Sequence, residues 1–352
     1  MKFRMRVISV GLVFFVVACS GDVGDDSSNA STDAGTDVGA DGDVGDDAST
    51  DAGEDASTFE CEEFPTAQIA GTEQTDELAE NPARCGQSEY SWLDGSQVGQ
   101  VTEVGHDEEF SKGLIEGILA SQDVDPPSEI AHDAEVLTYE YATQDRGQEV
   151  TATSMLAYPK GVQPAESPSE VLLFLHGTTG FTDECAASDG GAYKGLAALF
   201  ASMGYFVVAP DFIGLKSMGE ETGFLHPYLV GQATAIASLD AVRAAADLPA
   251  EERGDLCVNP RVLPIGGSQG GHAALWVDRL APYYARELEM LGSVATVPPA
   301  DMLGQMERAV DQLVDASGNT VAFLGSTAGW YGYEDDLDEV FVEPLDEEVP
   351  EN

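Results

Sequence analysis

Basic side chains are scarce in this sequence. Its 352 residues include 15 lysines and arginines against 64 aspartates and glutamates, which gives a formal net charge of −49 at pH 7. No lysine or arginine follows Arg308, whereas many carboxylates do. A field of this sign repels phosphate groups, so we expect no nucleic acid among the partners.

The apolar run near the N-terminus is short. Residues 7–18 follow three positive charges and form an apolar stretch of about a dozen residues, too few to span a bilayer core and typical of a signal peptide. The run ends in Val16-Val17-Ala18-Cys19, which resembles the lipobox of bacterial lipoproteins. We therefore expect residues 1–18 to be a lipoprotein signal and Cys19 to carry the lipid. An ordinary secretory signal with an incidental cysteine is the alternative.

Large apolar side chains are nearly absent from residues 19–59. This stretch consists mainly of Asp, Gly, Ala, Ser and Thr, so it has too little apolar surface to offset the entropy of ordering it. We interpret it as a disordered tether between the lipid and a folded domain. Its aspartates lack the spacing of calcium loops.

Cysteines are few. Besides Cys19, the chain has Cys61, Cys85, Cys185 and Cys257. Four thiols in an exported chain favour two disulfides, for which three connectivities exist. Of these we expect Cys61–Cys85 and Cys185–Cys257. No Cys-x-x-Cys or histidine cluster accompanies them, and the acidic C-terminal tail has no regular ligand spacing, so we expect no metal site.

The patterning changes after residue 130. Residues 136–142 and 149–158 alternate apolar and polar side chains and predict an antiparallel pair joined by a turn at residues 144–147. Beyond them, apolar strands alternate with helices, which predicts an α/β domain with a mainly parallel sheet covered on both faces. The further strands are expected at residues 171–175, 205–209, 262–265 and 293–297, and the helices at residues 114–119, 192–203, 231–246 and 271–289.

Ser268 is the candidate nucleophile. It is the centre of Gly266-Gly267-Ser268-Gln269-Gly270, which fits G-x-S-x-G between a predicted strand and a predicted helix. A serine on so tight a turn leaves no room for side chains at Gly266 and Gly270. The turn would raise the serine hydroxyl above the sheet and direct helix N-terminal N–H groups at a reacting oxygen.

A second loop follows the strand at residues 171–175. It reads His176-Gly177-Thr178-Thr179-Gly180. An oxyanion formed during acyl transfer needs two preformed N–H donors, and we expect these to be the backbone groups of Gln269 and Thr178. His176 and His272 are interpreted as packing or bracing residues.

Five segments together resemble the secretory lipase family, the α/β-hydrolase group that contains the fungal lipase A type. The segments are His176-Gly-Thr-Thr-Gly180, Gly204-Tyr-Phe-Val-Val-Ala-Pro-Asp-Phe-Ile-Gly214, His226-Pro-Tyr-Leu-Val-Gly231, Leu239-Asp-Ala-Val-Arg243 and Gly266-Gly-Ser-Gln-Gly-Gly-His272. The resemblance runs from about residue 135 to 340. It implies an α/β-hydrolase core at residues 60–301 with an N-terminal extension. Residues 302–352 would hold the start of a helical cap and an acidic tail.

The sequence departs from that family in one respect. The family's triad continues with an Asp and then a His after the cap, but no histidine follows His272. The last strands of the fold would also be missing. A serine without a base is a weak nucleophile, so we expect impaired activity. A return of His106 or His132 to the site is the less favoured alternative.

Three functions stay open on these grounds. The first is a serine carboxylic-ester hydrolase of esterase or lipase type, which forms an acyl-enzyme on Ser268. The second is a catalytically inactive surface lipoprotein or binding protein, and the third is a serine peptidase of the same fold. We expect a monomer without cofactor that acts on a small ester or lipid. It would be exported and anchored by lipid to the bacterial outer membrane or cell surface, with no other membrane contact.

Overall fold

The computed structural model describes residues 61–69, 91–162, 169–223, 225–311 and 317–333, and the single residues 337, 339 and 341. The predicted signal and tether, Cys19 at the predicted lipid site, Cys85 and most of the acidic tail lie outside the described residues. No helix of the described part is both long and apolar enough to cross a membrane.

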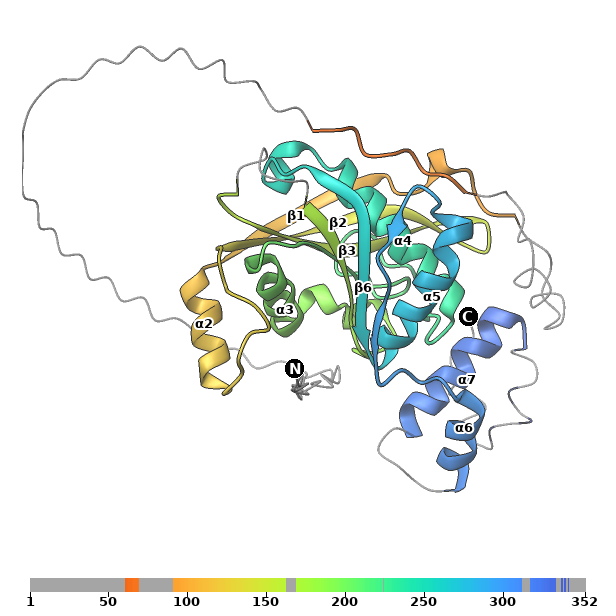
Figure 1. Ribbon diagram of the computed structural model, residues 1–352. Coiled ribbons are helices and arrows are strands. Elements are labelled where there is room, and N and C mark those ends of the chain that lie inside the picture. Colours follow the sequence, from red (N-terminus) through yellow and green to blue (C-terminus); the bar gives the residue numbers. More distant parts are fainter. Residues whose placement is uncertain are drawn as a thin grey trace, which may run out of the picture. The chain divides into compact units, whose positions relative to one another are not determined.

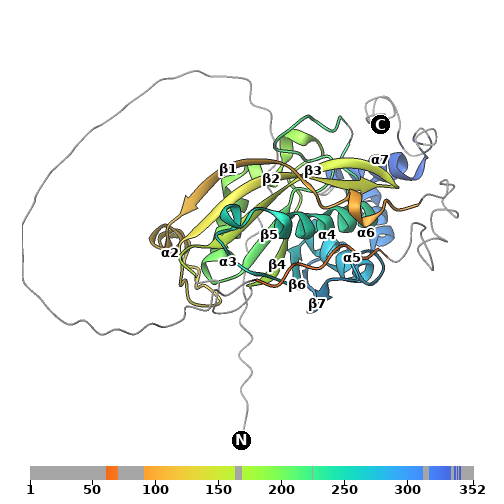
Figure 2. The same cartoon turned by 90° about the horizontal axis from the view of Figure 1, so that it is seen from above.

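A mixed sheet of eight strands forms the centre of the molecule (Figures 1 and 2). Its order is β1-β2-β3-β5-β4-β6-β7, and β8 also pairs with β6. The pairs from β1 to β5 are antiparallel, and β5, β4, β6, β7 and β8 run parallel. The strands are β1 (Val101–Phe110), β2 (Ala134–Asp145), β3 (Gln148–Pro159), β4 (Ser169–Leu175), β5 (Phe206–Pro210), β6 (Val258–Gly267), β7 (Glu289–Met290) and β8 (Val294–Thr296).

The predicted antiparallel pair is confirmed as the β2–β3 hairpin. Asp145 pairs with Gln148, so the loop consists of Arg146 and Gly147 alone. Both have positive φ angles, +48° and +73°. Positive φ at both loop positions is the geometry of a type I′ turn, which is favoured in two-residue hairpins because its twist matches the twist of the strands. The turn thereby sets the register of the longest strand pair in the sheet.

Helices cover both faces of the sheet, as predicted (Figure 1). Along β4, Leu173 and Leu175 pack into the cluster that contains α4 and α5, whereas Leu172 and Phe174 pack into the cluster with α2 and α3. Successive side chains of a strand point to opposite faces, so a strand buried on both sides is a continuous apolar run. The helices are α2 (Lys112–Ser121), α3 (Gly191–Ser202), α4 (Gly231–Asp247), α5 (Gln269–Tyr284), α6 (Met302–Asp311) and α7 (Ser317–Tyr331), with 3-10 turns η1 (Gly95–Gln97), η2 (Asp183–Cys185), η3 (Ala187–Asp189) and η4 (Ala250–Arg253).

Three sequence predictions are corrected in detail. The strand β1 lies in a region where no strand was predicted. The helix expected to reach residue 289 ends at Tyr284. The strand expected at residues 293–297 is shortened to β8, since Val297 adopts a φ angle of +43° and leaves the extended conformation.

The expected disulfide pairing is wrong. Cys61 bonds to Cys257 at the start of β6, and Cys185 is a free, half-buried thiol. The cause is the path of the N-terminal arm, residues 61–69. Its Gln68 backbone N–H donates to Glu287 at 2.7 Å and its carbonyl accepts from the Arg286 N–H at 3.1 Å. The arm therefore lies along the core, where its cysteine meets the start of β6.

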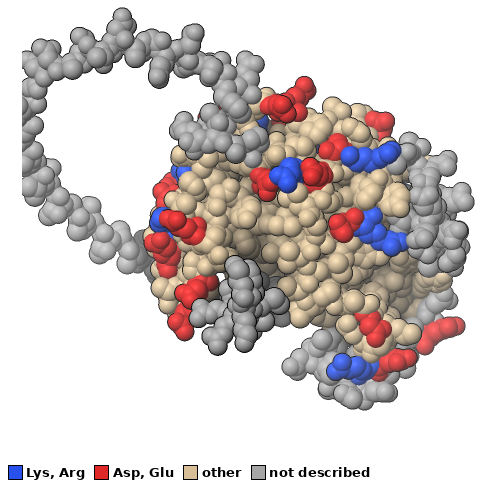
Figure 3. Space-filling view, in the orientation of Figure 1, with Lys and Arg blue, Asp and Glu red and all other residues tan. Residues whose placement is uncertain are grey.

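Basic side chains on the face drawn in Figure 3 lie beside acidic ones. Arg261 forms ion pairs with Glu170 and Glu289, and Lys194 approaches Glu108 to 3.7 Å. Pairs as exposed as these contribute little to stability. They do place carboxylates beside both of these cations.

Candidate active site

Ser268 stands at the junction of β6 and α5. Its φ and ψ angles are +55° and −120°, a conformation that non-glycine residues rarely adopt. The turn is held from two sides, because the Ser268 N–H donates to the Thr296 carbonyl and the His272 N–H donates to the Ser268 carbonyl, both at 3.0 Å. The Ser268 residue is half-buried. The strain is thus imposed by neighbouring backbone and is located at the candidate nucleophile.

The flanking glycines make this turn possible. A Cβ atom on Gly266 would lie 2.8 Å from the Leu175 carbonyl oxygen, and it would also clash with the backbone of Gly270. A Cβ on Gly270 would collide with the Leu175 backbone and lie 2.7 Å from the His176 carbonyl oxygen. Main chain cannot move aside as a flexible side chain can. The expectation that both positions have no space for a side chain is confirmed.

Gln269 begins helix α5 directly after the serine. The first N–H groups of a helix have no intrahelical acceptor, so they are available to a ligand at this end. The Gln269 side chain is buried, with 1% exposed, and its Nε2 lies 2.7 Å from Nε2 of His226. The residue thus combines an N–H at the helix N-terminus with a side chain that is fixed in the interior.

The loop with Thr178 lies next to this turn. Leu175, the last residue of β4, pairs with Gly266 on the parallel strand β6, so the residues after both strands meet at the same edge of the sheet. The main chain of Gly177 runs close to the Gly267 carbonyl oxygen, which is 3.7 Å from an ideal Cβ on Gly177. The Thr178 and Tyr228 hydroxyls share a hydrogen bond of 2.9 Å. The structure therefore brings the Thr178 and Ser268 segments together.

His176 lies beneath this loop. The ring is 2% exposed, with Nδ1 at 2.6 Å from the Gly177 carbonyl oxygen and Nε2 at 3.2 Å from the Asp211 carbonyl oxygen. It stacks on Phe212 with the ring centroids 4.3 Å apart. Burial lowers its pKa, because the charged ring would be desolvated. Its contacts are those of a bracing residue.

The remaining histidines are engaged or distant. Nε2 of His272 accepts from the Trp276 indole at 3.0 Å, and burial lowers the His272 pKa to about 4. His106 lies on β1, which β2, β3, β5 and β4 separate from β6. His132 lies just before β2, where its N–H donates to the Ser202 carbonyl. Within the part of the chain that the structure describes, no histidine forms a hydrogen bond to the Ser268 hydroxyl.

A buried carboxylate supports the loop after β5. Asp211 accepts hydrogen bonds from the Ser188 N–H at 2.8 Å and from the Ser188 and Thr153 hydroxyls at 2.6 Å each. Desolvation raises its pKa to about 7, although these donors act in the opposite direction. This aspartate lies in the motif of residues 204–214, for which the sequence predicted no individual role. Its role in the structure is to attach the loop after β5 to β3 and η3.

The two helices after residue 301 lie near the same edge of the core (Figure 1). The Asp301 carboxylate accepts from the Gly304 N–H at 3.0 Å and caps α6. On α7, the Ser326 hydroxyl donates to the His226 carbonyl at 3.0 Å, and Asn319 bonds to the Tyr228 hydroxyl. The helix α7 thus contacts the segment that also supports Gln269 and Thr178.

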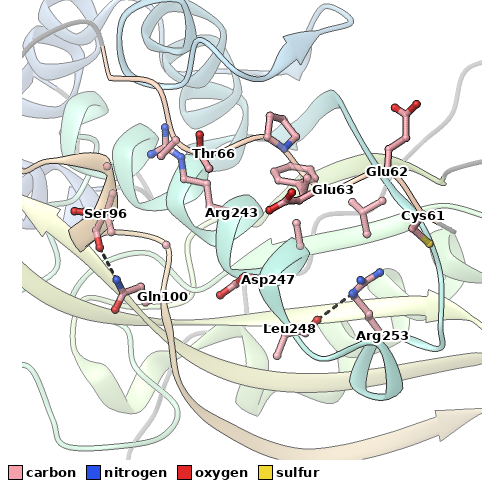
Figure 4. A pocket seen from close by; sticks show the side chains of 18 of the residues that line it. Cys61, Glu62, Glu63, Thr66, Ser96, Gln100, Arg243, Asp247, Leu248 and Arg253 are labelled. Atoms are coloured by element: carbon pink, nitrogen blue, oxygen red, sulfur yellow. Dashed lines mark hydrogen bonds between the residues drawn. The ribbon is translucent and has the colours of Figure 1, made fainter.

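A cleft of about 680 Å³ lies elsewhere, between the N-terminal arm and α4 (Figure 4). Its cations are already engaged. Arg243 pairs with Asp240 at 2.6 Å and with Glu287 at 2.7 Å, and Arg253 donates to the carbonyls of Leu248 and Leu256. Ser268 does not line this cleft. We therefore do not assign the reaction to it.

Comparison with known proteins places this geometry in context. Residues 194–346 match the model of the secretory lipase family. The chain is similar to a candidate hydrolase from Legionella pneumophila, at 24% identity over 71% of this chain and 66% of that chain, with a TM-score of 0.59. It is also similar to the rice cell wall degrading esterase LipA from Xanthomonas oryzae, at 24% identity over 66% of this chain and 60% of that one, with a TM-score of 0.57.

These likenesses show that the chain has the α/β-hydrolase fold, as the sequence predicted. No curated protein matches the chain. The chain spans 66% and 60% of the lengths of the two solved structures. An activity of those longer proteins therefore does not carry over directly to this chain.

Proposed function

We propose that this chain is a serine carboxylic-ester hydrolase that reacts through an acyl-enzyme on Ser268. The observation that carries the proposal is the strained φ angle of +55° at Ser268, at a strand-to-helix junction beside the loop of Thr178. The match of residues 194–346 to the secretory lipase family supports an ester as the substrate class.

The reaction would proceed in two steps. The Ser268 oxygen attacks the ester carbonyl carbon while the hydroxyl proton passes to a base. The carbonyl electrons move onto oxygen, and the oxyanion is held by the backbone N–H groups of Gln269 and Thr178. Collapse expels the alcohol, which takes up a proton, and leaves the acyl group on Ser268. Water then attacks the acyl carbon and the bond from this carbon to the Ser268 oxygen breaks. A proton from the water returns to the Ser268 oxygen, and the carboxylic acid is released.

Proton transfer limits the rate in this proposal. The ring nitrogens of His226 and His272 that could accept a proton already accept hydrogen bonds from Gln269 and Trp276. Both nitrogens of His176 face carbonyl oxygens. Within the described residues, these three histidines therefore have no free ring nitrogen to serve as the base, and removal of a catalytic histidine costs many orders of magnitude in rate. We expect slow acylation.

A fluorophosphonate probe tests the proposal. The full chain should label slowly, and Ser268→Ala should not label at all. Conversion of p-nitrophenyl esters of increasing acyl length would then separate esterase from lipase behaviour. Labelling that persists in Ser268→Ala would contradict the assignment of the nucleophile.

A non-catalytic surface lipoprotein is the second candidate. It is favoured by the engagement of the buried His176 and His226 and of the half-buried His272 in structural hydrogen bonds. It predicts no labelling of the wild-type chain, and no change in any cellular phenotype in Ser268→Ala. Labelling of the wild-type chain therefore distinguishes the two candidates.

We further propose that the protein is exported and anchored by a lipid on Cys19. The Cys61–Cys257 disulfide supports export, because such bonds persist in oxidising compartments. Metabolic labelling with a fatty acid should mark the wild-type chain and not Cys19→Ser. If the wild-type chain were secreted without a lipid, export would still account for the disulfide, but the proposed anchor would be contradicted.

A further inference from the structure

One short segment contacts both candidate oxyanion donors. It is His226-Pro227-Tyr228, here called the bracket, and it precedes α4. His226 meets the side chain of Gln269, and Tyr228 meets the side chain of Thr178. Gln269 and Thr178 follow two different strands, β6 and β4. The bracket is thus a common support for residues that the sequence places far apart.

The hydrogen bonds of His226 define its tautomer. Nδ1 lies 2.7 Å from the Ile213 carbonyl oxygen, which can only accept, so Nδ1 carries the proton. Nε2 then offers a lone pair, and the Gln269 amide donates to it across 2.7 Å. The His226 residue is 1% exposed, and desolvation lowers its pKa to about 4, so the ring stays neutral at neutral pH.

Gln269 has little else to orient it. Its Oε1 is buried and has no hydrogen-bond partner among the described residues. The contact with His226 therefore fixes the side chain of the first residue of α5. Fixing this side chain restricts rotation of the peptide that joins Ser268 to Gln269, and this peptide carries the candidate oxyanion N–H.

Tyr228 acts in the same way on the other donor. Its hydroxyl shares the 2.9 Å hydrogen bond with the Thr178 hydroxyl, and its ring packs edge-on against Phe181 with centroids 5.1 Å apart. The helix α7 contacts both ends of the bracket, because Asn319 bonds to the Tyr228 hydroxyl and Ser326 donates to the His226 carbonyl.

We propose that His226 and Tyr228 are positioning residues that set the two oxyanion donors through the side chains of Gln269 and Thr178, and that α7 braces them. The inferred hydrogen bonds do not depend on any reaction and are tested by themselves. The expected effect on the reaction rate rests on the proposed function and is tested separately.

Nuclear magnetic resonance of the full chain tests the geometry without any reaction. We expect a proton on Nδ1 of His226 and a scalar coupling across the hydrogen bond between its Nε2 and the Gln269 side-chain nitrogen. The Gln269 backbone amide should shift in His226→Asn, and the Thr178 amide should shift in Tyr228→Phe. A proton on Nε2, or unmoved amides in both variants, would overturn the proposal.

Labelling with a fluorophosphonate tests the kinetic part with a matched pair of variants. Asn can supply a donor near the position of Nδ1 but offers no acceptor at Nε2, whereas Gln can supply an acceptor near Nε2. Loss of one oxyanion donor typically costs about 10²–10³-fold in rate, so a misdirected donor in His226→Asn should cost about tenfold in the limiting labelling rate. His226→Gln should retain most of the rate, and His106→Asn, on the distant strand β1, should retain all of it.

The results distinguish this inference from the proposed function. If the wild-type chain shows the coupling but no labelling, and the two variants show the amide shifts, the esterase is refuted and the positioning is left intact. A wild-type chain that labels at the same rate as His226→Asn refutes the positioning and leaves the esterase intact. A thermal unfolding curve for each variant shows whether a lost rate reflects a lost fold.

Discussion

The indole N–H of Trp330 donates to Oδ1 of Asp145 across 2.8 Å, which joins α7 to the turn between β2 and β3. The Trp330 carbonyl also accepts from the Arg146 guanidinium at 2.9 Å, and that guanidinium lies 5.4 Å from the centroid of the Trp330 ring. Trp330 and Asp145 are 4% and 8% exposed. The helix α7 is therefore attached to the core on the side of the hairpin as well as at the bracket.

We predict that Trp330→Phe loosens α7. A smaller aromatic ring remains, but the buried Asp145 oxygen loses its donor, which should lower the free energy of unfolding by at least about 1–2 kcal/mol. Hydrogen exchange should quicken in α7 more than in α4. Tyr333→Phe, at an exposed position, is the matched control. Equal exchange in α7 of both variants would contradict the assigned attachment.

Ser268→Gly should be more stable than Ser268→Ala. Both variants lose the hydroxyl, but only glycine adopts a φ angle of +55° and a ψ angle of −120° without strain. Such strain costs on the order of 1–3 kcal/mol, and glycine's greater chain entropy in the unfolded state offsets part of it. We expect a difference of about 1 kcal/mol in urea denaturation. A more stable alanine variant would show that the turn is relaxed.

Removal of the Cys61–Cys257 disulfide should destabilise the protein. The bond closes a loop with a sequence separation of 196 residues, and the double variant Cys61→Ser, Cys257→Ser frees this loop in the unfolded chain. We expect a loss of about 2–5 kcal/mol in the free energy of unfolding under oxidising conditions. Cys185→Ser, which removes a free half-buried thiol, should change stability far less. A similar loss in both variants would contradict the observed pairing.

Acid should destabilise the fold through the half-buried His272. The pKa of His272 is lowered from 6.5 to about 4 by burial. Between these values the unfolded chain binds the proton and the folded chain does not, so stability is present above pH 6.5 and is lost as the pH falls towards 4. His272→Gln keeps an acceptor for Trp276 and does not titrate. Relative to this variant, the wild type should lose about 1–3 kcal/mol from pH 7 to pH 4.

Denaturation at several pH values measures this difference. Asp211 acts in the opposite direction, because its pKa is raised from 3.8 to about 7 and its contribution is lost as the pH rises through 7. The comparison with His272→Gln cancels this term, since Asp211 is present in both proteins. Parallel pH profiles of the two proteins would show that His272 titrates normally.

Local sequence accounts for most of the elements. The apolar run of β4, buried on both faces, and the left-handed turn at Arg146 and Gly147 follow from side-chain alternation and turn chemistry within a few residues. The crowding of Gly266 by the backbone of Gly270 follows from the tight junction between a strand and a helix. These features depend on residues that are close together in the sequence. Local patterns of apolar side chains and turn residues can therefore predict them. The catalytic role of Ser268 is a further step and stays a prediction.

Long-range partners could not be obtained in this way. The pairing of Cys61 with Cys257, the hydrogen bond from Gln269 to His226 and the attachment of Trp330 to Asp145 each join residues from different elements. Composition and periodicity carry no information on which elements become neighbours at a given point. Those contacts arise when the helices pack on the sheet, since a disulfide or a hydrogen bond forms only where packing brings two atoms within bonding distance.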